Sequence, residues 1–339
     1  MLQRTWAAGA FALCAISVGL WATSPTSASA QGSASTASDA APATHVVVPW
    51  GTGNGEVGLR RPQHEAPADG ASAVAVASDG SMLLLDRLNQ RVVRLDRQGR
   101  QRGPWTVTRV PADVEELTVA ADGALGVYSP LRARVWIYEG DVVTGEVPVP
   151  RGLRELLTIE LGASRNVIAR SAHQEMYRLG PPSAPQTLAS VLHSKREGAF
   201  ELTDGSGIAA RLDAKGRPEM LVLDVTGERT RVARRHALSS VPVLSARIVG
   251  VEHDVACVRL EHRIDGASFR VRRSVTCLNA SSGEIVLERE LGAVDGPYVP
   301  RRSFAMGGNP TRLVFMQPAD DGLHITAWDV PRAAQGGGQ

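Results

Sequence analysis

Apolar residues along this chain come in short runs that are separated by turn residues. Between residues 72 and 101, three β-rich runs alternate with three turns. The runs cover residues 73–77, 82–86 and 91–96, and the turns are Asp79-Gly80, Asn89-Gln90 and Gln98-Gly99. Such pairs provide the side-chain chemistry that tight turns between antiparallel strands require. The pattern predicts an antiparallel sheet of short strands.

The same pattern returns 43 residues later. Asp79-Gly80 recurs as Asp122-Gly123, and Arg91-Val92 recurs as Arg134-Val135. A period in the low forties is the length of one four-stranded blade of a β-propeller. Beyond this second copy the letters diverge, but the rhythm of strands and turns continues and gives six sets between residues 44 and 330. We therefore predict an all-β chain that folds as a six-bladed β-propeller.

The sixth set lacks an outer strand. Residues 45–50 precede the first set, and we expect them to pair with the last strand and close the ring. Closure leaves only short outer edges, which limits aggregation through open sheets. Two other architectures stay open on the pattern alone, a pair of β-sandwiches and a seven-bladed ring.

The first copy resembles an NHL repeat, in which Asp-Gly follows an apolar inner strand and Asn-x-Arg-Val follows a strand ending in Asp. The corresponding residues here are Asp79, Gly80, Asp86, Asn89, Arg91 and the turn residue Gly99. The resemblance covers residues 45–101 well and residues 115–145 faintly, because Ser129 and Arg132 replace Asp86 and Asn89. It implies a six-bladed propeller but no single activity, since this class ranges from protein- and RNA-binding modules to metal-dependent lyases and lactone hydrolases.

Two features of this region look like functional motifs but have a structural interpretation. Asp86 and Arg91 could act as an acid and its partner, but we expect Asp86 to accept turn amides and Arg91 to pair across the hairpin. Residues 53–58 match the letters G-x-G-x-x-G of a dinucleotide-binding loop. That loop must open a helix, whereas Arg60-Arg61-Pro62 follows here, so we predict a Gly-rich turn.

The first 30 residues predict a secretory signal peptide. Arg4 precedes an apolar run over residues 7–22, and residues 28–30 form a small-residue cleavage site. The alternative is a retained membrane anchor, which Pro25 and the cleavage site disfavour. The remaining predicted segments are a disordered Ser/Ala/Thr-rich linker (31–43), the propeller (44–332) and a flexible tail (333–339). We expect export to the periplasm or beyond, with no stable membrane insertion after cleavage.

Charge and composition limit the classes of partner. The chain has 37 basic and 35 acidic residues, and every basic residue except Lys195 and Lys215 is an arginine. A near-neutral balance without a dense basic tract argues against nucleic acid as a partner. Aromatic residues make up 4% of the chain, which leaves little material for stacking platforms. We predict a monomer that does not bind nucleic acid.

Candidate catalytic chemistry is sparse. The eight histidines include no pair with a metal-ligand spacing such as H-x-x-x-H, and no G-x-S-x-G motif occurs. We therefore predict no metal and no cofactor. Arg301-Arg302, after a Gly-Pro loop, has two interpretations: a small contact for an anionic ligand at the rim, or solvated charge.

Cys257 and Cys277 are the two cysteines that follow the predicted signal peptide, and they lie on neighbouring predicted strands. If they face each other, the same register places Glu261 opposite Arg273, a favourable cross-strand pair. A strict two-residue turn at Asp265-Gly266 would instead keep the thiols apart. In an oxidising compartment we expect the disulfide to form.

Together these features favour an exported binding or scaffold module that engages a protein or small ligand through its loop faces. They assign no catalysis. The alternative is a propeller-type hydrolase or lyase with a site at the mouth of the central channel. That alternative requires several His, Asp or Glu side chains to converge on the channel.

Overall fold

The computed structural model of the chain divides into two units, Met1–Thr36 and Ala37–Gln339, and all described residues belong to the second. The described residues are 42–64, 66–101, 107, 109–153, 156–184, 186–225, 230–264, 271–293 and 296–332. The predicted signal peptide, almost all of the predicted linker and the predicted tail lie outside these ranges. Among the described residues, no helix is long and apolar enough to cross a membrane.

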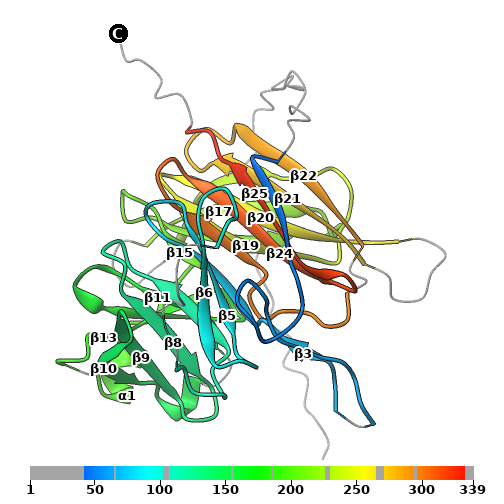
Figure 1. Ribbon diagram of the computed structural model, residues 1–339. Helices are drawn as coiled ribbons and strands as arrows, with labels where there is room; N and C mark the ends of the chain where they lie inside the picture. The colour runs from blue at the N-terminus through cyan, green and yellow to red at the C-terminus, as the bar shows by residue number, and fades with distance from the viewer. Residues whose placement is uncertain are drawn as a thin grey trace, which may run out of the picture. The chain divides into compact units, whose positions relative to one another are not determined.

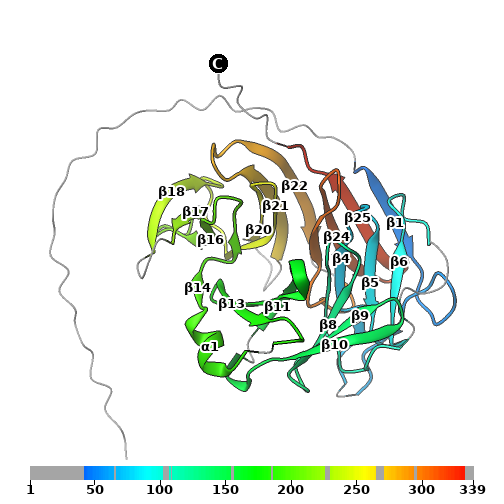
Figure 2. The same ribbon diagram turned by 90° about the vertical axis from the view of Figure 1, so that its left-hand side faces the viewer.

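Six antiparallel sheets form the blades of a β-propeller, arranged in a ring (Figures 1 and 2). Blade 1 contains β4 (Ala73–Val76), β5 (Met82–Asp86) and β6 (Arg91–Leu95). Blade 2 contains β7 (Glu116–Val119), β8 (Leu125–Ser129), β9 (Arg134–Glu139) and β10 (Val142–Pro148). Blade 3 contains β11 (Leu156–Leu161), β12 (Val167–Ser171), β13 (Glu175–Gly180) and β14 (Arg196–Glu197).

The other three blades have four strands each. Blade 4 contains β15 (Phe200–Glu201), β16 (Gly207–Leu212), β17 (Pro218–Asp224) and β18 (Arg231–Ala237). Blade 5 contains β19 (Ser245–Glu252), β20 (Val255–Arg263), β21 (Val271–Asn279) and β22 (Ile285–Ala293). Blade 6 contains β23 (Phe304–Gly307), β24 (Arg312–Ala319), β25 (Gly322–Asp329) and β1 (Thr44–Val48).

The remaining elements are small. The hairpin of β2 (Leu59–Arg60) and β3 (Asp69–Gly70) precedes blade 1, and α1 (Leu188–His193) connects β13 to β14. Two short 3-10 helices, Arg151–Leu153 and Ala163–Arg165, lie in the loops on either side of β11.

The ring closes as the sequence predicts. The N-terminal strand β1 pairs with β25, the last strand, so that Val46 lies opposite Ile325. The buried guanidinium of Arg312 secures the closure, because it donates to Thr44 Oγ1 (2.7 Å) and to the carbonyl of Arg97 in blade 1 (2.7 Å). The six-bladed prediction is confirmed, and the seven-bladed and sandwich alternatives are not what the sheet topology shows.

Apolar clusters lie between neighbouring blades rather than in one central core. One joins blades 6 and 1 through residues such as Val74 and Met316, and others join blades 1 and 2, 2 and 3, 4 and 5, and 5 and 6. Between blades 3 and 4, hydrogen bonds bridge the junction: the Gln174 amide pairs with the backbone of Ala210, and Arg170 donates to the carbonyl of Ala199. This polar junction borders the central channel.

Candidate functional site: the arginine-lined channel mouth

The inner strands of the blades surround two cavities. The first, of about 440 Å³, lies at the carboxyl ends of the inner strands and is lined by residues such as Ala120, Gly162 and Gly307. The second, of about 250 Å³, lies at their amino ends, and we call it the N-end cavity. Arg170, Phe200, Val249 and Arg302 line both cavities and therefore lie between them.

Four consecutive blades contribute to the N-end cavity. Its lining residues are Thr158, Arg170, Ser171, Ala172 and Gln174 of blade 3, Ala199 and Phe200 of blade 4, Ala246, Arg247, Ile248, Val249 and Arg259 of blade 5, and Arg301, Arg302, Ser303 and Phe304 beside blade 6. All titratable residues among these are arginines, five in number. The cavity combines cationic hydrogen-bond donors with an apolar wall.

Arg170, near the end of β12, is buried and held from several sides. Its Nε donates to the carbonyl of Ala199 (2.6 Å), its Nη2 pairs with the carboxylate of Glu160, and its guanidinium carbon lies 3.8 Å from the centre of the Phe200 ring. Burial, together with the positive charge of Arg302, lowers the pKa of Arg170 to about 9. The structure thus fixes one guanidinium against an aromatic face in the channel.

Arg247 and Arg259 lie directly opposite each other on β19 and β20. Arg259 is mostly buried, and its Nη2 lies 3.4 Å from Oε1 of Glu261. Burial lowers the pKa of Arg259 to about 10; Glu261 opposes this shift, while the cations Arg273 and Arg247 add to it. Like charges directly opposite each other in a sheet destabilise it.

Arg301 and Arg302 precede β23 and are partly buried, with side chains 29% and 17% exposed. Arg302 donates from Nη1 to the carbonyl of Leu117 (3.1 Å) and from Nε to that of Phe304 (3.3 Å). Both arginines lie 3.8 Å from the carboxylate of Glu116, which is fully buried. The sequence allowed two interpretations of this pair, a contact for an anionic ligand or solvated charge. The structure places both arginines at the N-end cavity, with side chains that are largely shielded from solvent.

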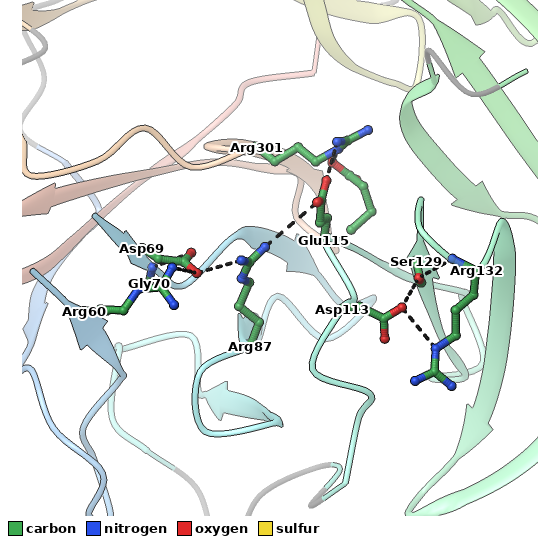
Figure 3. Close-up of polar contacts among 10 residues, drawn as sticks. Arg60, Asp69, Gly70, Arg87, Asp113, Glu115, Ser129, Arg132 and Arg301 are labelled. Atoms are coloured by element: carbon green, nitrogen blue, oxygen red, sulfur yellow. Dashed lines mark hydrogen bonds and ion pairs between the residues drawn. The ribbon is translucent and has the colours of Figure 1, made fainter. Parts of the chain in front are cut away.

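Figure 3 shows how Arg301 is tied to the blade 1 side of the ring. The carboxylate of Glu115 pairs with Arg301 and lies 4.0 Å from Nη1 of Arg87. Arg87 in turn contacts Asp69 in the β2–β3 hairpin at 2.6 Å. This chain of alternating charges links the hairpin to the segment before β23 and so positions one wall of the N-end cavity.

The motif residues Asp86, Asn89 and Arg91 do not line the N-end cavity but lie at the turn between β5 and β6 of blade 1. The buried Asp86 carboxylate accepts hydrogen bonds from Arg91 Nε (2.8 Å), Asn89 Nδ2 (2.8 Å) and the backbone N–H of Gly58 (3.0 Å). The Arg91 guanidinium donates to the carbonyl groups of Thr52, Gly53 and Glu56. These hydrogen bonds therefore hold the Gly-rich loop against blade 1, and the loop directs its carbonyl groups toward the Arg91 guanidinium.

The other motif residues lie in turns. Asp79 Oδ1 accepts a hydrogen bond from the N–H of Ser81 (2.9 Å), while Gly80 takes a φ of 78° in the same β4–β5 turn. Gly99 takes a φ of 82° and packs against Val46, where a Cβ atom would come within 2.9 Å of the valine. At both glycines a side chain would be strained.

Blade 2 replaces the Asp86 carboxylate from a different position in the chain. Ser129 occupies the place of Asp86, and its hydroxyl donates to Asp113 Oδ2 at 2.5 Å (Figure 3). Arg132 Nε contacts the same oxygen at 3.0 Å. Asp113 belongs to the loop before β7. Strand β8 therefore lacks the aspartate of the motif, but a carboxylate from another part of the chain contacts the residues at that position.

Cys257 and Cys277 form a disulfide between β20 and β21. They lie opposite each other in the register that also pairs Glu261 with Arg273, and Glu261 Oε1 is 3.2 Å from Arg273 Nε. The predicted bridge is confirmed, whereas the register of a strict two-residue turn is wrong. Residues 265–270, where that turn was expected, lie outside the described residues.

The sequence did not single out Arg170, Arg247 or Arg259. With nearly all basic residues being arginine, no composition signal separates these three from the rest. A weak signal exists for Arg170, a charge at the end of the apolar run Val167–Ala169. Within the described residues, no group of three or more His, Cys, Asp or Glu side chains is placed to hold a metal ion.

Comparisons with known proteins add distant structural likenesses. No family model and no curated protein matches the chain. Among solved structures, a protein of unknown function from Bacteroides caccae is 14% identical, with 68% of this chain and 84% of that chain covered and a TM-score of 0.42. A member of the DUF4221 family from Bacteroides vulgatus is 13% identical, with 81% and 98% covered and a TM-score of 0.42. Virginiamycin B lyase from Staphylococcus aureus is 11% identical, with 78% and 86% covered and a TM-score of 0.36.

Proposed function

We propose that this chain is an exported binding module that takes a small ligand at the N-end cavity and does not transform it. The observation that carries the proposal is the composition of that cavity, where four blades bring polar donors to an apolar wall. Phe200, Phe304 and Ile248 supply apolar surface, while the arginines and Gln174 supply donors. A concave site with a few convergent polar groups on apolar walls is typical of small-molecule binding.

Export is supported by the disulfide and by the signal-peptide pattern of the first 30 residues. Cys257 and Cys277 are both fully buried in blade 5. Structural disulfides persist in oxidising compartments such as the periplasm or the extracellular space. The bridge joins β20, which carries Arg259, to β21, so it also fixes the blade that presents two of the five arginines.

A steric plug tests the proposed site. Ala172 is exposed and lines the N-end cavity, so Ala172→Trp would fill the mouth without disturbing a buried position. Ala214 is an exposed turn residue that is not among the lining residues, so Ala214→Trp is the matched control. Each purified protein is incubated with the small-molecule fraction of spent culture medium, and the retained molecules are identified by native mass spectrometry.

We expect wild type and Ala214→Trp to retain the same small molecule, and Ala172→Trp to retain at least tenfold less. Equal retention by both tryptophan variants would refute the site. Recovery of a chemically altered molecule would instead favour the propeller-type hydrolase or lyase. Capture of proteins without any small molecule would contradict the proposal as well.

A further inference from the structure

Positively charged side chains line the N-end cavity, whereas the carboxylates that pair with them do not. Each arginine except Arg247 contacts a glutamate, and these glutamates are Glu115, Glu116, Glu160 and Glu261. None of the four is among the described residues that line the cavity, and Glu160 instead lines the cavity at the opposite end of the channel. The carboxylates therefore hold the guanidinium groups from behind, and the groups present positive charge to the cavity.

Two of these arginines have donor capacity to spare. Arg259 Nε is buried and has no hydrogen-bond partner within the described part of the chain. Arg247, directly opposite, is exposed, and no ion pair or hydrogen bond of its side chain occurs among the described residues. A buried donor without an acceptor is costly, and like charges directly opposite each other in a sheet repel. An anion in the cavity would offset the repulsion between Arg247 and Arg259.

Arg170 and Arg302 form a second pair of neighbouring cations, each of which also contacts a glutamate. Arg170 and Arg302 lie between the two cavities, and the charge of Arg302 contributes to the lowered pKa of Arg170. Strongly perturbed pKa values cluster at functional sites. The planar guanidinium donates two parallel hydrogen bonds to carboxylate or phosphate oxygens, which selects oxyanions over other ligands.

From this geometry we infer that the N-end cavity binds a small organic oxyanion, a carboxylate or a phosphate, with Arg247 and Arg259 as its charge contacts. The inference rests on the proposed function and names its ligand class. A cavity of about 250 Å³ with Phe200 and Phe304 in its wall suits an anion with a short apolar body. Arg247 sits at the exposed side, where it would meet the ligand first.

The test uses probes of defined charge. Binding of succinate, of inorganic phosphate and of succinamide, the neutral isostere of succinate, is measured by isothermal titration calorimetry on the exported chain. We expect succinate or phosphate to bind and succinamide not to bind, and the preferred anion identifies the oxyanion chemistry. Affinity should fall as salt is raised, because charge attraction is screened.

Two neutralising variants locate the contact. Arg247→Gln should leave the fold intact, because the Arg247 side chain is exposed and has no ion pair among the described residues. Arg259→Gln tests the buried arginine of the pair. Arg231→Gln on β18 is the matched control, since Arg231 is also exposed, lacks an ion pair in the described residues and does not line the cavity. We expect at least a tenfold loss of anion affinity in the first two and none in the control.

The outcomes separate this inference from the proposed function. Equal affinity in Arg247→Gln and Arg231→Gln, succinamide binding as tightly as succinate, or no binding of either anion at millimolar concentration would each overturn the oxyanion inference. If Ala172→Trp still blocks retention of the culture-medium ligand in that case, the proposed site stands and only its ligand class is wrong. If Ala172→Trp leaves succinate binding intact, the anion binds elsewhere and the inference fails.

Discussion

Replacing Asp86 with Ala should destabilise the propeller by about 3–5 kcal/mol, the cost of removing one partner from a buried ion pair. The Asp86 carboxylate is fully buried, and the Arg91 side chain that it contacts at 2.8 Å is 7% exposed. Removal of the carboxylate also leaves the N–H of Gly58 and the amide of Asn89 without this acceptor. The perturbation therefore releases the loop around residues 51–58 from blade 1 as well as the buried charge.

Asp86→Asn separates charge from shape in the same site. The amide has nearly the size of the carboxylate, but in either orientation its NH₂ group would face a donor: the side chains of Asn89 and Arg91 on one side, or the N–H of Gly58 on the other. A buried donor left without an acceptor costs about 1–3 kcal/mol, so the isosteric variant should also be destabilised. A merely steric role for Asp86 would leave Asp86→Asn at wild-type stability.

Urea unfolding followed by circular dichroism measures both variants. The matched control is Glu146→Ala, which breaks a 2.7 Å pair with Arg134 in which both side chains are about half exposed. An exposed pair contributes at most about 1 kcal/mol, so the control should shift the midpoint little at constant slope. The reasoning is refuted if Asp86→Ala is no more destabilising than Glu146→Ala.

Two further predictions concern the disulfide and a buried acid. The double variant Cys257→Ala/Cys277→Ala should lose about 3 kcal/mol of stability, which is the chain-entropy figure for a bridge of this separation. In the wild-type protein, two free thiols titrated at these positions after denaturation without reductant would contradict the bridge. Burial raises the pKa of Glu116 to about 7 from 4.5, against the lowering effect of Arg302 and Arg301. Because the folded state binds this proton more tightly, the stabilisation is present below pH 4.5 and is lost, on the order of 3 kcal/mol, as pH rises to about 7. Glu116→Gln should flatten the unfolding free energy over that range and raise it above pH 7, whereas a pH profile identical to wild type would contradict the raised pKa.

Local patterns in the sequence predicted the strands of the blades and the strand that closes the ring. The Asp-Gly turns and the short apolar runs specify strands whose partners are the next strands along the chain, so each sheet follows from neighbouring residues. The disulfide register belongs to the same class, because β20 and β21 form one hairpin and a single register places both Cys257 with Cys277 and Glu261 with Arg273. Only the closure of β1 on β25 required a long-range pairing, and the missing strand of the last set predicted it.

The identity of local partners was decided by the tertiary structure. As predicted, Asp86 accepts a turn amide, the N–H of Asn89 at 3.4 Å, but its shorter N–H contact, at 3.0 Å, comes from Gly58 in a loop 28 residues upstream. In blade 2, Asp113 supplies the carboxylate that the strand lacks, from a position that does not align with the motif. When a residue elsewhere in the chain supplies the missing group, the contact is kept, but an alignment of the repeat sequences does not show it.

Alternation and turn chemistry predicted the repeating unit, a six-bladed ring and its closing strand. The seven-bladed and sandwich alternatives and the second cysteine register were excluded only by the sheet topology and the strand register. The candidate site was decided by the ring alone. Arg170 and Arg259 lie on the second strands of blades 3 and 5, and Arg302 precedes the inner strand of blade 6; all three line the N-end cavity because these blades pack side by side around the channel. Their convergence depends on how blades 3, 5 and 6 pack around the channel, which no local pattern specifies, and nothing in the composition separates them from the other arginines of this chain.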